Sequence, residues 1–182
     1  MLPIGPLMKE HRKIERMVAL IASEAESLAG DDLVEPHLEF IDAAVTFMRE
    51  YADECHHGKE EDILFAALRK REISDEHQSI LERLLADHER GRELIRALDD
   101  ASDRWEDGED DARGEIVEAL QGVADLYPDH IRTEDKQFFI PAMDYLDNEE
   151  KEDMMEEMWD FDHDLFTGLY EGCITEFESD ED

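Results

Sequence analysis

Six side chains in four separate stretches of the sequence combine the residue types and the spacing of a metal site. Four histidines each continue a run of apolar residues that recur three or four positions apart. These are His11, His56, His88 and His130. Residues at this spacing share one face of a helix, so the imidazoles are expected to face the protein interior. Glu60 follows His56 by four positions, and Glu134 follows His130 in the same way, so two stretches present an imidazole and a carboxylate together.

Two buried carboxylates in one interior would repel each other and would be costly to bury without compensating charge. A pair of metal ions between them is the simplest source of that charge, and helical bundles house two-metal carboxylate sites of this kind. A mixture of imidazole and carboxylate ligands favours iron, manganese or zinc over calcium or magnesium. We therefore expect a metal centre that contains two ions, with iron as the leading candidate and manganese or zinc as the alternatives.

The segment CHHGKEE offers two registers for the second stretch, His56 with Glu60 or His57 with Glu61. Acidic residues precede His57 on its own helix face, whereas apolar residues precede His56. A local repeat agrees, because the stretch that begins at His56 aligns without a gap with the one that begins at His130. We take His56 and Glu60 as the ligands and expect His57 and Glu61 on the outer face or behind the ligands.

The elements that carry these residues are expected to be long amphipathic helices. Apolar residues recur at helical spacing throughout, and few windows show the alternation that is typical of strands. The expected helices cover residues 6–30, about 36–71, 74 to the polar turn at 107–110, about 111–145 and about 149–170. Short connections make neighbouring helices antiparallel. The fold class is therefore all-α, an up-down-up-down four-helix bundle with an additional C-terminal helix, in a single domain over residues 1–175 and with an acidic frayed tail over 176–182.

The composition excludes several classes of partner. The chain of 182 residues has 53 Asp and Glu against 18 Lys and Arg, a formal net charge of -35. Nucleic acids and anionic membrane surfaces repel such a chain. We expect neither a signal peptide nor a membrane span, and the two cysteines, Cys55 and Cys173, are too few for a disulfide scaffold. We expect a cytoplasmic protein adapted to a high salt concentration, which screens the repulsion between its own charges.

Four motifs, one in each of the first four expected helices, carry a resemblance to a known family. They are Glu10-His11-Arg12-x-Ile14-Glu15, the stretch from Cys55 to Phe65, Asp87-His88-x-x-Gly91-Arg92, and the run from Tyr127 through His130 to Pro141. From Pro3 to about Tyr170 the chain resembles the hemerythrin-like HHE cation-binding domain family. The resemblance implies a non-haem di-iron centre inside the bundle, in which Glu60 and Glu134 bridge the two irons and the four histidines are divided between them.

The chain departs from the oxygen-carrying members of that family at two positions. Oxygen-carrying hemerythrins have a fifth histidine one turn before the position of His88, where this chain has Leu84. They also place a carboxylate five residues after the histidine of the fourth helix, so that Asp135 is the alternative to Glu134. With four histidines and two carboxylates, each metal would keep at least one open position, which favours a site that reacts, senses or exchanges over a tuned oxygen carrier.

The resulting hypothesis is a di-iron protein that binds or senses oxygen or a related small species, nitric oxide or peroxide. The alternative hypothesis is a di-iron enzyme or repair protein that breaks down peroxide or nitric oxide or donates iron, or an iron store.

Three further residues are interpreted as parts of the structure and not as metal ligands. Tyr127 is expected in the core, with a hydrogen-bonding role at the centre as the alternative; Cys55 is expected to be a buried thiol and His163 a surface residue.

Overall fold

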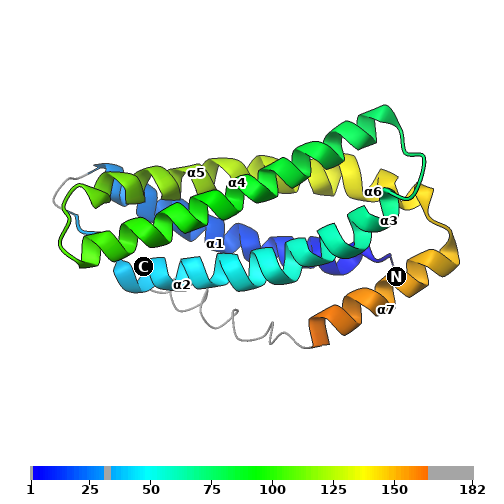
Figure 1. Ribbon diagram of the computed structural model, residues 1–182, viewed down its shortest axis with the longest axis horizontal. Coiled ribbons are helices and arrows are strands. Elements are labelled where there is room, and N and C mark those ends of the chain that lie inside the picture. The colour runs from blue at the N-terminus through cyan, green and yellow to red at the C-terminus, as the bar shows by residue number, and fades with distance from the viewer. Residues whose placement is uncertain (1, 31–33, 164–182) are drawn as a thin grey trace.

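The computed structural model describes residues 2–30 and 34–163, and for residue 163 it describes the backbone only. The described part contains helices and no strand (Figure 1). Four long helical rods lie side by side in alternating directions, and a shorter helix lies outside them. The predicted all-α, up-down-up-down bundle with an additional C-terminal helix is therefore confirmed. The end of the expected fifth helix, the side chain of His163, Cys173 and the tail 176–182 lie outside the described residues.

The four rods follow one another along the chain, and all four begin within two residues of the predicted starts. The first rod is α1 (Ile4–Gly30) and the third is α4 (Asp75–Glu106). The second rod consists of α2 (Leu38–Thr46), η1 (Phe47–His57), η2 (Glu60–Phe65) and α3 (Ala66–Leu68). The fourth consists of α5 (Ala112–Thr133), η3 (Glu134–Phe138), α6 (Phe139–Ala142) and the short 3-10 turn η4 (Met143–Tyr145), and the outer helix is α7 (Asn148–His163).

The ends of α4 follow from local chemistry. Ser74 has an extended backbone, and its side-chain oxygen accepts a hydrogen bond from the backbone N–H of His77 at 3.2 Å, which caps the first turn as the sequence predicts. At the other end, Gly108 in the polar turn has a φ of 90°, a conformation that glycine adopts without the steric cost of a Cβ atom. The turn reverses the chain, so α5 runs antiparallel to α4.

Three segments of the second and fourth rods are π-helical, namely η1, η2 and η3. A π-helix closes its hydrogen bonds from residue i to residue i+5 and so places more residues in each turn than an α-helix. Two of the six candidate ligands begin such segments, Glu60 in η2 and Glu134 in η3, and His56 lies next to the last residue of η1. The backbone therefore departs from α-helical spacing at three of the candidate ligands.

The hydrophobic core is divided into two clusters by a polar layer. On α1, for example, Leu7 belongs to one cluster and Ile14 to the other, and the polar residues Glu10 and His11 lie between them. In each of the other three rods, buried polar residues also separate residues of one cluster from residues of the other. Met154 and Met158 of α7 belong to the cluster nearer the N-terminus of α1, so this outer helix packs against one half of the bundle.

The approach of α7 to the second rod is close. A Cβ atom on Gly58 would lie 2.8 Å from Cζ of Phe161, so this contact requires a residue without a side chain. None of the helices in the described ranges has both the length and the apolar character that crossing a membrane requires.

Candidate metal centre

The six residues expected to bind metal lie together in the polar layer between the two hydrophobic clusters. Each of the four rods contributes at least one of them. Their exposed fractions are 0% for His11, Glu60 and Glu134, 1% for His56 and His88, and 3% for His130. Side chains from four distant parts of the sequence therefore share one interior that excludes solvent.

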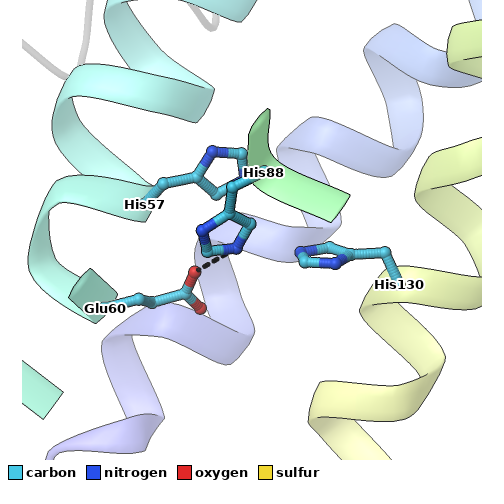
Figure 2. A group of neighbouring side chains, drawn as sticks. All are labelled: His57, Glu60, His88 and His130. Atoms are coloured by element: carbon cyan, nitrogen blue, oxygen red, sulfur yellow. Dashed lines mark ion pairs between the residues drawn. The ribbon is translucent and has the colours of Figure 1, made fainter. Parts of the chain in front are cut away.

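Two groups of potential ligands occur in this layer, and within each group the ligand atoms all lie within 4.8 Å of one another. The first group consists of His11, His56, Glu60 and Glu134, and the second of His57, Glu60, His88 and His130. Figure 2 shows the second group, in which His57, Glu60 and His88 lie close together and His130 points toward them from the opposite side. Glu60 belongs to both groups, so they adjoin one another.

The two glutamates lie between the groups. The two oxygens of Glu60 face different groups, with Oε1 at 3.3 Å from His56 Nε2 and Oε2 at 3.4 Å from His88 Nε2. Glu134 Oε2 lies 3.2 Å from Nε2 of both His11 and His130, and its Oε1 lies 3.8 Å from His88 Nε2. A carboxylate in this position can contact two ions at once.

The position of His57 corrects one sequence-based expectation. His57 does not lie on the outer face: it is 2% exposed, and its ring stacks on that of His88 with centroids 3.9 Å apart. The expectation assumed α-helical spacing, in which consecutive residues point about 100° apart. Because η1 is π-helical, the interior face of this rod holds both His56 and His57. The fifth imidazole, absent where Leu84 stands, is thus present on a different helix.

Carboxylates behind the ligands hold the histidine rings in place. Asp135 Oδ1 lies 2.8 Å from Nδ1 of His11, Glu10 Oε2 lies 2.8 Å from Nδ1 of His56, and Glu61 Oε1 lies 2.8 Å from Nδ1 of His88. Such a carboxylate accepts the Nδ1 proton and leaves the Nε2 lone pair free for a metal. Asp135 and Glu61 therefore lie on the Nδ1 side of these rings, away from the candidate ligand atoms.

The remaining two histidines have the same kind of neighbour. His57 Nδ1 lies 3.2 Å from Oδ1 of Asp53, within hydrogen-bonding distance. His130 Nδ1 lies 3.6 Å from Oδ2 of Asp87, which is an ionic contact rather than a hydrogen bond. All five imidazoles thus direct Nδ1 toward an acid.

A buried lysine completes the surroundings of the first group. Lys59 is 0% exposed, and its Nζ donates to Glu10 Oε1 and, at 2.5 Å, to Asp162 Oδ1 on α7. Burial alone would lower the pKa of Lys59, but the two carboxylates raise it, so the ammonium keeps its charge. Lys59 therefore connects α7 to the acid that orients His56.

The two central glutamates have opposite protonation tendencies when no metal compensates them. Burial, and then repulsion from Glu134, raise the pKa of Glu60 well above its usual range. Burial also disfavours the charge on Glu134, but the surrounding histidines His130, His11 and His88 outweigh it and lower the pKa of Glu134. The interior thus accommodates one negative charge, and a second requires a cation between them.

Two of the histidines also have opposite protonation tendencies, His11 of the first group and His57 of the second. Burial would lower the pKa of His11, yet hydrogen bonding to Asp135 and the neighbouring Glu134 raise it to about 9. For His57, burial followed by the proximity of His88 lowers the pKa well below its usual value, so this ring is neutral and has a lone pair to share.

The unpaired polar atoms of the interior indicate what the centre holds. Among the described residues, nine buried side-chain nitrogen and oxygen atoms have no hydrogen-bond partner, and all nine belong to the six predicted ligands. Both oxygens of Glu60 and of Glu134, and Nε2 of every one of the four histidines, are included. Buried polar groups are normally satisfied. These atoms, all of them ligand types for transition metals, therefore fit bound cations.

Sequence reasoning missed His57 as a member of the cluster, and it missed Glu10 and Lys59 as parts of the buried network. The available signal was the adjacency of two histidines, because neighbouring residues lie about 100° apart on a helix and both can face a wide buried side, as Glu10 and His11 do on α1. No feature of the sequence marks Lys59 as buried, since lysine is seldom found without solvent contact.

The interpretations of Tyr127 and Cys55 agree with the structure. Tyr127 is 4% exposed and belongs to the larger hydrophobic cluster. Cys55 is a buried free thiol whose pKa is raised to about 12 by burial and by neighbouring acids. It is therefore protonated and unreactive in this environment.

Comparison with known proteins identifies the bundle. The family model described as the hemerythrin HHE cation binding domain matches residues 2–142, which include all four rods up to α6 and exclude α7. No curated protein and no solved structure matches the chain.

Proposed function

The chain belongs to the hemerythrin HHE cation-binding domain family, and we propose that its centre binds two iron ions and exchanges a small ligand there, oxygen, nitric oxide or peroxide. The proposed ligands are the six predicted residues, His11, His56, Glu60, His88, His130 and Glu134, joined by His57. In this assignment Glu60 and Glu134, whose oxygens lie near histidines of both groups, would hold both ions. Manganese and zinc remain the alternative metals for the same ligand types.

One observation carries this proposal, namely the set of nine buried atoms without partners. Leaving a single buried polar atom unpaired costs roughly 1–3 kcal/mol, so nine such atoms without compensation would cost roughly 9–27 kcal/mol, as much as the whole typical net stability of about 5–15 kcal/mol. Cations that coordinate these atoms remove that cost. Cations between the two carboxylates also supply the positive charge that the interior lacks.

The chain contributes orientation, charge balance and exclusion of water. The acids behind the histidines direct Nε2 inward, and the two hydrophobic clusters close the polar layer on both sides. The first ligand group has two histidines and the second has three, so the ion of the first group would have fewer imidazole ligands. Iron bound there would supply the electrons for binding a diatomic molecule or peroxide, chemistry that the side chains alone do not provide.

Metal analysis of the purified protein, followed by anaerobic loading with ferrous iron and exposure to air, tests the proposal. We expect about two iron ions per chain, from the number of ligand groups, and a visible absorption band that appears with air. His56→Ala and Glu134→Ala should lose both metal content and absorption. His37→Ala and Glu54→Ala change exposed residues of the same types and serve as controls. Full metal content and an unchanged spectrum in the first two variants would show that the ligands are wrongly assigned.

The same preparation distinguishes binding from catalysis. Loss of peroxide beyond one equivalent per centre would indicate turnover, whereas loss that stops at one equivalent indicates stoichiometric reaction. The result decides between the binding or sensing function and the alternative of an enzyme.

A further inference from the structure

Arg92 lies one helical turn after His88 on α4 and ends the motif Asp87-His88-x-x-Gly91-Arg92. Residues four positions apart share one face of a helix, so Arg92 is attached on the same face as a candidate ligand. Its side chain is 30% exposed. A guanidinium has no lone pair to offer a metal, so any role of Arg92 at the centre must act through other residues.

The guanidinium of Arg92 contacts two carboxylates of the second rod. Its Nε donates to both oxygens of Asp53 at 2.9 and 3.0 Å, and its Nη2 lies 2.8 Å from Oδ1 of the same residue. Nη2 also donates to Oε1 of Glu61 at 2.7 Å. Because the guanidinium is planar and rigid, one group fixes the positions of both acids relative to each other.

The same two acids face the Nδ1 atoms of two histidines of the second ligand group. Asp53 Oδ1 lies 3.2 Å from Nδ1 of His57, and Glu61 Oε1 lies 2.8 Å from Nδ1 of His88. In each acid, the oxygen that faces the ring is also in contact with Arg92. The two rings stack on each other, with centroids 3.9 Å and planes 12° apart (Figure 2). The guanidinium, the two acids and the two imidazoles therefore form a closed ring of contacts.

The acids behind the other three histidines have separate cations. Within the described part of the chain, each of these cations contacts the orienting acid of one histidine. The pairs are Arg12 with Asp135, Lys59 with Glu10, and Arg83 with Asp87. Arg92 differs because its two acids serve two histidines, and both belong to the second ligand group. Loss of Arg92 would therefore affect two of the three imidazoles of that group and none of the first group.

We propose that Arg92 is a positioning residue, which holds His57 and His88 together in the orientation that binds the ion of the second ligand group. The inference rests on the function proposed above, in which that group binds one of two ions.

The physical basis is the repulsion between the two acids that Arg92 joins. Asp53 and Glu61 have like charges, and their side chains are 27% and 26% exposed. Without the guanidinium between them, the two carboxylates repel each other and are free to turn toward solvent. Each imidazole then loses the partner that fixes its Nδ1, and with it the orientation of the nitrogen that binds metal.

Titration of the metal-free protein with cobalt(II), whose visible absorption depends on its ligands, tests the proposal for each ion separately. We expect the unmodified protein to bind two cobalt ions, one at each ligand group. Arg92→Gln should bind one ion with unchanged affinity and the other about 10–100-fold more weakly, the range that follows from loss of the groups behind metal-bound histidines. Removal of a positive charge would by itself favour cation binding, so this weakening would measure positioning. Circular dichroism checks that the variant keeps its helical fold.

Arg92→Lys separates geometry from charge. An ammonium keeps the charge but lacks the planar fork that joins both acids, so Arg92→Lys should not restore the affinity for the second ion. The matched control is Arg90→Gln, an exposed arginine on the same helix that pairs with Glu93, and it should bind both ions as the unmodified protein does. Unmodified affinity for both ions in either Arg92 variant would overturn the proposal. Equal weakening of both ions in Arg92→Gln would also overturn it, because the effect would then be a general one on the fold.

Nitrogen NMR of the histidine rings provides a second readout that requires no metal. In the metal-free protein, Arg92→Gln should change the ring-nitrogen signals of His57 and His88. The signals of His11 and His56 should stay as they are, because other acids orient those rings. Unchanged signals of His57 and His88 would overturn the proposal. An unmodified protein that binds no cobalt would refute the proposed function, while these spectra would still decide whether Arg92 positions the two rings, so the two failures can be distinguished.

Discussion

Replacing Glu60 by glutamine is expected to stabilise the metal-free protein and to weaken its response to metal. Glu60 is fully buried beside Glu134, and both its oxygens lack partners. Its pKa is raised by burial and by Glu134, so the folded metal-free protein holds a proton on Glu60 that the unfolded chain releases. Glutamine has the same shape and is neutral at every pH, so it avoids the uptake of that proton.

The magnitude follows from proton linkage. A carboxyl whose pKa is raised on folding destabilises the folded state increasingly as the pH rises above its unfolded pKa of about 4.3, by about 1.4 kcal/mol per pH unit until the folded pKa is reached. If Glu60 keeps its proton from pH 5 to pH 7, the advantage of Glu60→Gln grows by about 3 kcal/mol over that interval. For a chain of this length, that corresponds to a relative rise in Tm of about 6–12 °C.

Thermal unfolding of both proteins in chelator, at a series of pH values and in concentrated salt, measures this difference. Glu61→Gln is the matched control, because Glu61 is adjacent in sequence and its pKa is lowered: burial opposes the charge, but the bonds to His88 and Arg92 outweigh it. Glu61 is ionised in both states over this interval, so Glu61→Gln should be destabilising by an amount that does not change between pH 5 and pH 7.

Addition of metal should reverse the order of the two proteins. The amide of Glu60→Gln lacks the charge needed to bridge two cations, so most of the metal-induced rise in Tm should disappear. The reasoning is refuted if the free-energy difference between Glu60→Gln and the unmodified protein is equal at pH 5 and pH 7, since Glu60 would then be ionised in the metal-free interior.

Three further predictions concern protons, the buried lysine and salt. His11 has a pKa of about 9 in the metal-free protein. Below that pH, a metal ion must displace the proton of His11 in order to bind. The apparent affinity for metal in chelator competition should therefore rise by up to about tenfold per pH unit from pH 7 to 9. An affinity that does not change with pH would exclude His11 as a ligand. Lys59→Met leaves Glu10 and Asp162 without their cation and should lower the free energy of unfolding by about 3–5 kcal/mol in chemical denaturation, whereas a change under 1 kcal/mol would contradict a buried ion pair. Because the net charge is -35, Tm should rise from about 0.1 M to about 1 M salt, as the Debye length falls from about 10 to about 3 Å; a constant Tm would count against self-repulsion.

The bundle and most of the cluster were predictable because each depends on a pattern that local sequence contains. His11 and His130 continue apolar runs at helical spacing, and that spacing alone places both side chains in the interior. The choice of Glu134 over Asp135 followed from the same spacing, and in the structure Glu134 faces the centre while Asp135 faces His11 from behind.

The parts that could not be predicted depend on departures from that spacing or on contacts between distant residues. His57 was expected on the outer face or behind the ligands because acidic residues share its face at α-helical spacing, whereas the backbone there is π-helical. Lys59 is buried because Glu10 on α1 and Asp162 on α7 both reach it, over sequence separations of 49 and 103 residues. Such compensation of a buried charge is a property of the assembled fold and has no local signature.

The π-helical turn before His57 makes the number of histidines at the centre depend on chain length as well as on residue type. Deleting one residue between Phe47 and His57 would return this stretch to α-helical register and rotate the residues before the deletion by about 100° relative to those after it. Met48 and Ala52 before the deletion, and His56, His57 and Glu60 after it, could then not all keep their present inward positions, while every one of these residues would still be encoded. A single deletion, rather than a substitution, would therefore turn candidate ligands away from the centre, a route by which related bundles could differ in ligand number without losing any histidine.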